Sequence, residues 1–252
     1  MDIQALIFDV NGTLIDIETD EGMEEIYRAI GHFLSYQGIT LHRWEVRDLY
    51  FEIMREQRRN SQEAYPEWNA VELWRELIRR RATDYTRSLP PEKLEQMPVF
   101  LAELYRGISR KRLRPFPGVK QSLDLLRPHY RMAVISNAQS AYGVPELNAT
   151  GLLHYFHPVI ISGDYGFGKP DRRIFQQALD ALHLQPEQVL FIGNDLYDDV
   201  FGAQQLGIKT IFFAPRPQDT HREIQPDYII YDFAELPTAV NYFVERKQLP
   251  KQ

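Results

Sequence analysis

Short apolar runs alternate with amphipathic stretches along the second half of this chain, and one similar run stands near its start. Four runs have the composition of strands buried on both faces: ALIFDV at residues 5–10, MAVIS at 132–136, VIIS at 159–162 and VLFI at 189–192. Shorter strands are expected at residues 210–213 and 228–230, and helices at residues 119–126, 171–182 and 199–206. Strands that alternate with helices predict a parallel α/β sheet with right-handed crossovers.

Residues 20–112 have a different pattern, rich in Glu, Arg, Leu and aromatic residues, without a run typical of a buried strand. Apolar side chains recur there at helical spacing, as Tyr27, Ile30 and Leu34 do. The first strand must nevertheless join the later sheet. We therefore expect an α/β fold with a Rossmann-like parallel-sheet core domain, residues 1–15 and 115–252, and an inserted all-helical cap domain, residues 16–114.

Two charged runs flank this helical block. The basic run RGISRKRLR at residues 106–114 is expected to be a solvated helix end, with a phosphate-steering patch as the alternative. Asp16, Glu18 and Asp20 are expected to lie in a solvated acidic loop. The alternative for this loop is that it repels strongly anionic substrates or binds an amine.

Composition narrows the class of protein. The 252 residues include no Cys and carry a net charge of −6, which excludes disulfides and thiolate metal sites and gives no basic nucleic-acid footprint. No stretch approaches the roughly 18 apolar residues of a membrane span, and the first residues lack the pattern of a signal peptide. We expect a soluble cytoplasmic protein, a monomer or homodimer, without nucleic-acid or membrane partners.

Polar residues follow each expected buried strand. Ligands of open parallel sheets bind at the carboxyl ends of the strands, so these residues should meet at one site. Carboxylates, amides and one lysine suit a tetrahedral anion beside a hard cation such as Mg²⁺. The residues are Asp9, Asn11, Gly12 and Thr13 after the first strand, Ser136 and Asn137 after the second, Lys169 after the glycine-rich residues 163–168, and Asn194, Asp195, Asp198 and Asp199 after the fourth.

Four motifs in this order resemble those of the haloacid-dehalogenase-like (HAD) hydrolase superfamily, in the branch with a helical cap between the first and second motifs. The resemblance covers the whole chain. The motifs are Ile7-Phe8-Asp9-Val10-Asn11-Gly12-Thr13, Val134-Ile135-Ser136-Asn137, Gly168-Lys169-Pro170-Asp171, and Ile192-Gly193-Asn194-Asp195 continued through Asp199 to Gly202-Ala203.

The resemblance implies a role for each motif. Asp9 would attack phosphorus and form an aspartyl-phosphate. Ser136 and its neighbours Asn137, Gly12 and Thr13 would bind the substrate, and Lys169 would neutralise developing charge and hold Asp9. The Mg²⁺ ligands would come from the following set: Asp9, the backbone carbonyl of Asn11, Asn194 or Asp195, and Asp199.

The sequence departs from the phosphatase pattern at two positions. Phosphatases of this family carry a second Asp, the general acid, where this chain has Asn11. An amide cannot deliver a proton, so good leaving groups are favoured. The fourth motif has Asn194 in the usual position of its first Asp. We expect Asp195 to serve as ligand, with Asn194 as neighbour or substitute.

The function expected from these motifs is Mg²⁺-dependent hydrolysis of a small phosphorylated metabolite. A 2-haloacid dehalogenase is the first alternative, since that reaction needs neither an acid nor a metal. Those enzymes, however, typically carry Tyr at the position of Asn11 and a less acidic fourth motif. The second alternative is a pseudo-enzyme of low activity that binds phosphorylated ligands.

Overall fold

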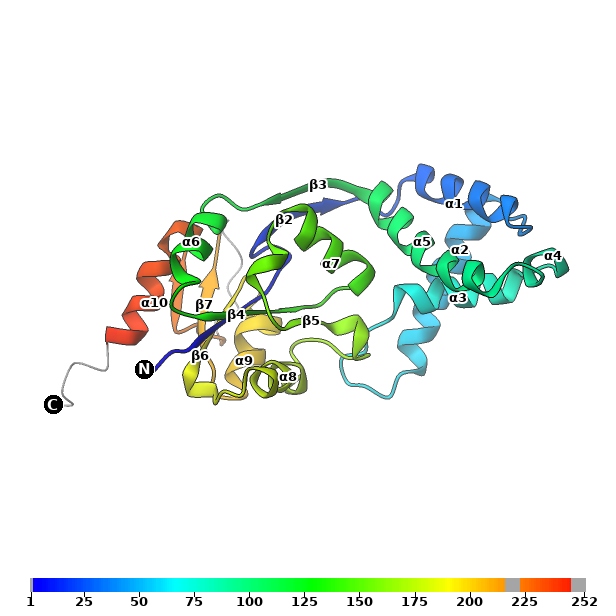
Figure 1. Cartoon of the computed structure of the whole chain (residues 1–252). Helices are drawn as coiled ribbons and strands as arrows, with labels where there is room; N and C mark the ends of the chain where they lie inside the picture. Colours follow the sequence, from blue (N-terminus) through cyan, green and yellow to red (C-terminus); the bar gives the residue numbers. More distant parts are fainter. Residues whose placement is uncertain (1, 216–222, 246–252) are drawn as a thin grey trace.

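The computed structural model describes residues 2–215 and 223–245 of the chain, and these form two parts (Figure 1). The α/β part contains the parallel sheet, and the helical segment contains the helices between residues 24 and 109. The ends of the expected core, Met1 and residues 246–252, lie outside the described residues.

The sheet of the α/β part has six parallel strands in the order β5-β4-β1-β6-β7-β8. The first strand of the chain lies in its centre, so the predicted α/β Rossmann-like fold is confirmed. The strands are β1 (Ala5–Phe8), β4 (Arg131–Ser136), β5 (Val159–Ile161), β6 (Val189–Gly193), β7 (Lys209–Phe213) and β8 (Tyr228–Ile230).

Side chains of β1 alternate between the two faces of the sheet, and both faces are buried. Leu6 and Phe8 pack into the apolar cluster beneath α6 and α10, whereas Ala5 and Ile7 pack into the cluster beneath α8. A strand buried on both faces must be apolar throughout, which explains the continuous apolar runs. The helices around the sheet are α6 (Val119–Leu126), α7 (Ser140–Ala149), α8 (Arg172–Leu182), α9 (Gly202–Gln204) and α10 (Leu236–Glu245).

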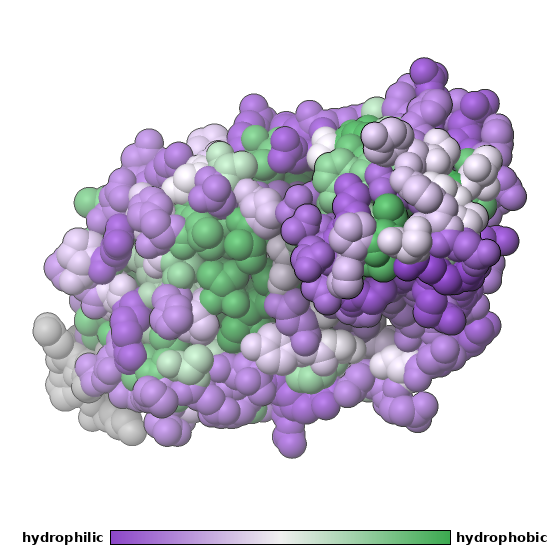
Figure 2. All heavy atoms as spheres, turned by 45° about the vertical axis from the view of Figure 1, so that its right-hand side comes forward, coloured by the Kyte–Doolittle hydropathy of each residue, from purple (hydrophilic) through white to green (hydrophobic). Residues whose placement is uncertain are grey.

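The helical segment has an apolar core of its own. Tyr50, Trp74 and Tyr105 are fully buried in it, and the rings of Tyr50 and Tyr105 stack with centroids 4.5 Å apart. Its surface is largely hydrophilic (Figure 2). No helix among the described residues is both long and apolar enough to cross a membrane. The helices are α1 (Glu24–Tyr36), α2 (Arg43–Asn60), α3 (Ala70–Arg81), α4 (Asp84–Arg87) and α5 (Pro91–Ser109).

Two antiparallel strands, β2 (Ile15–Thr19) and β3 (Arg110–Pro115), join the two parts. Residues 110–112 were expected to continue the helical pattern and instead belong to β3. The expected all-helical cap, residues 16–114, therefore has strand residues at both of its ends. The expected boundary at residues 15/16 and 114/115 cuts through both strands.

The same strands correct the predictions for the two charged runs. The basic residues from Arg110 onward form a strand rather than a helix end, and the acidic residues lie opposite them rather than in a solvated loop. Opposite charges that face each other across a strand pair stabilise the pairing. The pairs are Asp16 with Arg112 at 2.9 Å and with Arg114 at 3.0 Å, Asp20 with Lys111 at 2.6 Å, and Glu18 with Arg112.

Two further elements differ from the expectation. Helix α7 was not anticipated, because Gly143 and Pro145 interrupt its apolar pattern. The helix expected at residues 199–206 begins earlier, with a π-helical turn, η4 (Leu196–Phe201), that runs into α9. The earlier start places Asp199 inside a helical turn, where its side chain can reach back to the preceding loop.

Asp16 provides a test of the strand pair. Burial favours a higher pKa, but the hydrogen bonds from Arg112 and Arg114 outweigh it and lower the pKa of Asp16 below its ordinary value. A lowered folded-state pKa contributes stability above the unfolded pKa, and this contribution is lost as the pH falls through the folded pKa. Asp16→Asn should therefore cost about 2 kcal/mol at pH 7 and progressively less below about pH 4. Urea unfolding of both proteins from pH 7 to pH 3 measures this, and a loss independent of pH would contradict it.

Candidate active site

Polar residues meet at the carboxyl ends of four neighbouring strands. Asp9 directly follows β1, and its backbone N–H donates to the carbonyl of Ile192 in β6 at 2.9 Å. Ser136 ends β4, Gly193 ends β6, and Lys169 follows β5 by way of the glycine-containing loop. The strand order places these ends side by side, as the sequence predicted.

Lys169 joins two buried carboxylates. Its Nζ donates to Oδ1 of Asp9 and to Oδ1 of Asp199, each at 2.6 Å. The side chains of Lys169, Asp9 and Asp199 are 3%, 8% and 1% exposed. Burial alone lowers the pKa of Lys169, but the carboxylates of Asp199 and Asp9 outweigh burial and hold this pKa well above its ordinary value. Lys169 is therefore a fixed cation between two carboxylates.

Asp199 is held from a second side by the backbone. Its Oδ2 accepts from the N–H groups of Asn194 at 3.0 Å and Asp195 at 2.9 Å. A side chain at Gly193 would place its Cβ 2.4 Å from Cγ of Asp199, so only glycine leaves room for this carboxylate. Burial raises the pKa of Asp199 even though Lys169 lowers it. The geometry makes Asp199 an anchor for Lys169.

Oxygen atoms of three residues surround the side-chain amide of Asn194. One terminal atom of this amide lies 3.1 Å from the backbone oxygen of Asn11, 3.2 Å from Oδ2 of Asp9 and 2.9 Å from Oγ1 of Thr13. The Thr13 hydroxyl also lies 3.1 Å from Oδ2 of Asp9. Gly12, at φ 89°, leaves space for the amide, since a Cβ there would lie 2.6 Å from Nδ2 of Asn194. The structure thus brings Asp9, Asn11, Thr13 and Asn194 together.

Asp195 has different neighbours. Its Oδ1 accepts from the backbone N–H groups of Tyr197 at 2.8 Å and Asp198 at 2.7 Å, so it caps the turn η4. Among the described residues, no group of three or more Asp, Glu or His side chains is placed to hold a metal ion. The backbone oxygen of Asn11 and the side-chain amide of Asn194 lie together beside Asp9 and could offer oxygen ligands to a cation there.

Ser136 and Asn137, at the end of β4, have different surroundings. Ser136 is buried at the end of β4. The side chain of Asn137 accepts from the N–H of Lys169 at 2.8 Å and donates to the carbonyl of Lys169 at 3.0 Å. Nδ2 of Asn137 also lies 3.2 Å from Oδ2 of Asp198. Asn137 therefore fixes the backbone that carries Lys169, and its expected contact with substrate remains a prediction.

The sequence missed the segment between α2 and α3, residues 61–69, which lies on the α/β part. Gly168 N–H donates to the carbonyl of Tyr65 at 3.1 Å, and Glu67 N–H donates to the carbonyl of Gly166 at 3.0 Å. Gln139 of the α/β part bonds the carbonyl of Trp68 and the N–H of Ala70, each at 2.7 Å. The segment is visible between the two parts in cyan (Figure 1). The break in helical periodicity around Pro66 was the available signal.

Side-chain contacts also join the helical segment to the α/β part. Arg106 of α5 donates to Glu146 of α7 at 2.6 Å, and the side chain of Glu146 is 2% exposed. The hydroxyls of Tyr65 and Tyr197 lie 3.0 Å apart and connect segment 61–69 to η4. Glu67 lies close to Gly168, and burial raises the pKa of its carboxyl. The helical segment therefore contacts the loop that carries Lys169.

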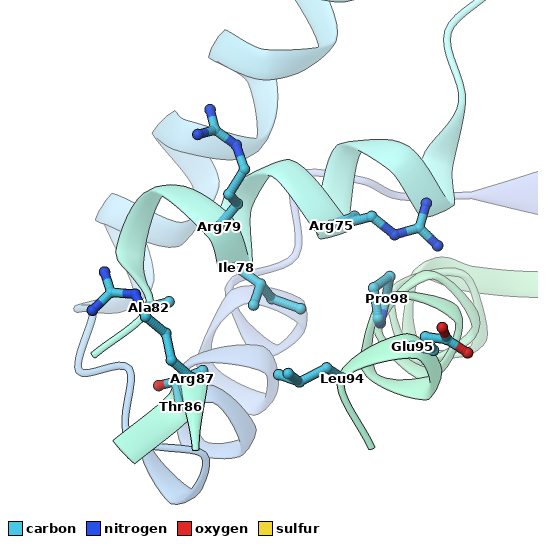
Figure 3. A pocket seen from close by; sticks show the side chains of 9 residues that line it. All are labelled: Arg75, Ile78, Arg79, Ala82, Thr86, Arg87, Leu94, Glu95 and Pro98. Carbon is cyan, nitrogen blue, oxygen red and sulfur yellow. The ribbon is translucent and has the colours of Figure 1, made fainter. Parts of the chain in front are cut away.

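A pocket of about 340 Å³ lies within the helical segment (Figure 3). Its apolar lining includes Ile78, Leu94 and Pro98. Its arginines are each paired within their own helix, namely Arg75 with Glu72, Arg79 with Glu76 and Arg87 with Asp84. None of the strand-end residues lines this pocket, so it is separate from the site around Asp9.

The fold and the site define a Rossmann-like α/β protein with a buried lysine-linked carboxylate pair at its strand ends. A family model for haloacid dehalogenase-like hydrolases matches residues 3–207. The chain belongs to this hydrolase family, which confirms the predicted superfamily, while its assignment to the branch with a helical cap stays a prediction.

Similar proteins include phosphatases and a dehalogenase. The chain is 31% identical over 162 residues to a glyceraldehyde 3-phosphate phosphatase of Methanothermobacter thermautotrophicus, which covers 61% of this chain and 72% of that protein. It is 31% identical over 183 residues to a phosphoserine phosphatase of Thermus thermophilus, covering 68% of each. A 2-haloacid dehalogenase structure from Pseudomonas syringae pv. Tomato matches with a TM-score of 0.71 at 22% identity, over 96% of this chain and 99% of that one, and shows a shared fold.

Removing the buried cation tests the electrostatics of the site. Lys169→Met leaves Asp9 and Asp199 without their ammonium partner, so we expect a loss of about 3–5 kcal/mol in unfolding free energy at pH 7. Burial raises the pKa of Asp199 and Lys169 lowers it, so without Lys169 the pKa of Asp199 rises further. The loss should therefore shrink between pH 7 and pH 5 as this carboxylate takes up a proton. Urea unfolding at both pH values measures it. Lys209→Met, which removes a lysine 46% exposed from its pair with Asp227, should cost less than about 1 kcal/mol; similar losses for both variants would contradict the prediction.

Proposed function

We propose that this hydrolase is a Mg²⁺-dependent phosphatase of small phosphorylated metabolites, with Asp9 as nucleophile. The carrying observation is the geometry of the Asp9 carboxylate. Lys169 holds its Oδ1 at 2.6 Å, and the hydroxyl of Thr13 lies 3.1 Å from its Oδ2. A carboxylate held at both oxygens on the end of a strand is oriented for attack on a bound electrophile. The phosphatase relatives support a phosphoryl group as that electrophile.

The proposed chemistry has two steps. A carboxylate oxygen of Asp9 attacks phosphorus, the bond from phosphorus to the leaving oxygen breaks, and an aspartyl-phosphate forms. Water then cleaves this acyl phosphate and restores Asp9. The ammonium of Lys169 faces the phosphoryl charge as it develops, and Ser136 and Asn137 at the end of β4 are the proposed phosphoryl-binding residues. Most of the catalysis would come from positioning and electrostatics.

The oxygens around Asn194 fit a magnesium ion. Neighbouring ligand oxygens of an octahedral Mg²⁺ site lie about 2.9 Å apart, close to the 3.1 and 3.2 Å between the Asn194 amide and the oxygens of Asn11 and Asp9. We propose Asp9 Oδ2, the Asn11 carbonyl and the Asn194 side chain as protein ligands. In this proposal Asp195 stays at its cap and Asp199 stays on Lys169. A bound cation would screen the repulsion between the Asp9 carboxylate and an anionic substrate.

Asn11 limits the leaving groups that this site can expel. Its side-chain Oδ1 is buried and has no hydrogen-bond partner among the described residues. An amide at this position cannot protonate a departing alkoxide. Acyl phosphates, phosphoanhydrides and aryl phosphates, whose leaving groups are stable as anions, are therefore the favoured substrate classes.

The helical segment is proposed to act as a cap, with a core formed by residues 1–15 and 115–252 and a cap formed by residues 16–114. Its segment 61–69 lies against the loop that precedes Lys169, which supports a role in excluding water and selecting the substrate. A cap that contacts the catalytic loop directly is suited to couple substrate enclosure to the chemistry.

Haloacid dehalogenation is the second candidate. It is favoured by Asn11, because release of halide requires no acid, and by the lack of a three-carboxylate cluster among the described residues. In that reaction Asp9 would attack carbon and displace halide without a cation. Ligand binding without turnover is the third candidate. The dehalogenase would release halide, and the binding protein would release no product, whereas the phosphatase would release phosphate.

The nucleophile is tested with Asp9→Ala. Phosphate release from acetyl phosphate and p-nitrophenyl phosphate in Mg²⁺ should fall on the order of 10³-fold or more, and excess chelator should abolish it in the unchanged protein. Asp180→Ala, on the exposed face of α8, is the control and should retain activity. Chloride release from 2-chloropropionate that survives chelator would replace the phosphatase proposal with the dehalogenase. If the protein showed neither activity, ligand binding without turnover would be the remaining candidate.

The missing acid is tested with Asn11→Asp. If Asn11 limits protonation of the leaving group, this variant should increase turnover of alkyl phosphates by about 10²- to 10⁴-fold. Turnover of p-nitrophenyl phosphate should change far less, because its leaving group needs no proton. Equal gains on both substrates would show that position 11 acts in another way.

A further inference from the structure

The side-chain amide of Asn194 can present either Nδ2 or Oδ1 to the oxygens around it, and these two orientations have opposite chemistry. When its Nδ2 points inward, it donates to the Asn11 carbonyl at 3.1 Å and to Asp9 Oδ2 at 3.2 Å. When its Oδ1 points inward, it accepts from the Thr13 hydroxyl at 2.9 Å, but it faces two other oxygens at the same short distances. Oxygens without a proton between them repel, so the second orientation requires a cation among them.

Thr13 supports both orientations. Its hydroxyl lies 2.9 Å from the inward atom of Asn194 and 3.1 Å from Oδ2 of Asp9. The hydroxyl can accept from the amide N–H while it donates to Asp9, or it can donate to the amide oxygen. Neither orientation of Asn194 therefore loses this hydrogen bond.

We propose that Asn194 is a two-position amide whose N–H group takes the place of the cation at Asp9. Without a cation, Nδ2 points inward and holds Asp9 and the Asn11 carbonyl together. When Mg²⁺ binds, the amide turns by half a rotation about its Cβ–Cγ bond and presents Oδ1 as a ligand. This inference rests on the proposed function only for the cation site beside Asp9.

The charges of the site explain why an amide differs from a carboxylate here. Lys169 is already shared between Asp9 and Asp199, so one ammonium group faces two carboxyl groups. A carboxylate at position 194 would lie 3.2 Å from Asp9 and could not donate to it. Like charges at that distance are costly without a cation and favourable with one. Asn194 should therefore stabilise the cation-free protein and weaken its affinity for Mg²⁺.

The experiment compares thermal unfolding and Mg²⁺ calorimetry of the full chain with those of Asn194→Asp. In chelator, the variant should unfold at a lower temperature than the unchanged protein. Its dissociation constant for Mg²⁺ should be at least about tenfold smaller, because a carboxylate is a stronger ligand than an amide. The order of the two unfolding temperatures should consequently reverse as Mg²⁺ is added. A variant that is as stable as the unchanged protein in chelator, or that binds Mg²⁺ no tighter, would overturn the proposal.

Two further variants serve as controls. Asn194→Leu, which neither donates nor ligates, should be less stable in chelator and should gain nothing from Mg²⁺. Asp195→Asn keeps a capping oxygen for η4 and should bind Mg²⁺ as the unchanged protein does. Weaker Mg²⁺ binding in Asp195→Asn would assign the ligand to Asp195 and refute the role of Asn194.

A measurement on the unchanged protein avoids any problem with the folding of a variant. In protein labelled with ¹⁵N-asparagine, the side-chain NH₂ signal of Asn194 should be protected from exchange in chelator and should shift and lose protection at saturating Mg²⁺. An unchanged signal at saturation, or no Mg²⁺ binding at 20 mM, would overturn the proposal. These measurements do not depend on turnover. A failure of the phosphatase proposal would instead be seen as the absence of phosphate release, so the two failures can be told apart.

Discussion

The ion pairs of Lys169 with Asp9 and Asp199 are the constraint on which the rest of the site depends. Taking three charges out of water is costly unless each is paired and hydrogen-bonded. Several features of the α/β part meet that requirement: Gly193 leaves room for Asp199, two backbone N–H groups bind its second oxygen, and Asn137 fixes the backbone of Lys169. The strand ends thus form one electrostatic unit assembled from four distant parts of the sequence.

Amide side chains, as well as carboxylates, lie at the strand ends around Asp9. The side-chain amide of Asn194 faces Asp9, and the nearby carboxylate of Asp195 is turned toward the turn η4. An amide at position 194 adds no negative charge beside Asp9, whereas a carboxylate there would. In the proposed function, Asn11 and Asn194 would therefore influence the leaving group, the cation and the stability of the protein together.

Most of the sheet and the grouping of the strand-end residues could be predicted from the sequence, because continuous apolar runs and their terminal polar residues are local signals. The strands β2 and β3 could not, since charges that look solvated along the chain are paired across it, as Asp16 is with Arg112. The position of segment 61–69 and the choice between Asn194 and Asp195 depend on contacts between distant residues. A one-residue difference in sequence decides which side chain faces Asp9, and the capping of η4 by Asp195 leaves Asn194 in that position.

The central place of β1 in the sheet has a consequence for how the chain folds. Ala5 pairs with Arg131 on one side and with Val189 on the other, so the middle of the sheet cannot close until most of the chain has been synthesised. The helical segment has its own apolar core, whose buried residues lie between Ile26 and Tyr105 apart from Tyr142. Because contacts between distant residues form slowly, folding should begin in the helices. During that time β1, which is fully apolar, has no paired neighbour strand. The strand that precedes Asp9 is in this way also an apolar segment exposed to aggregation until the sheet is complete.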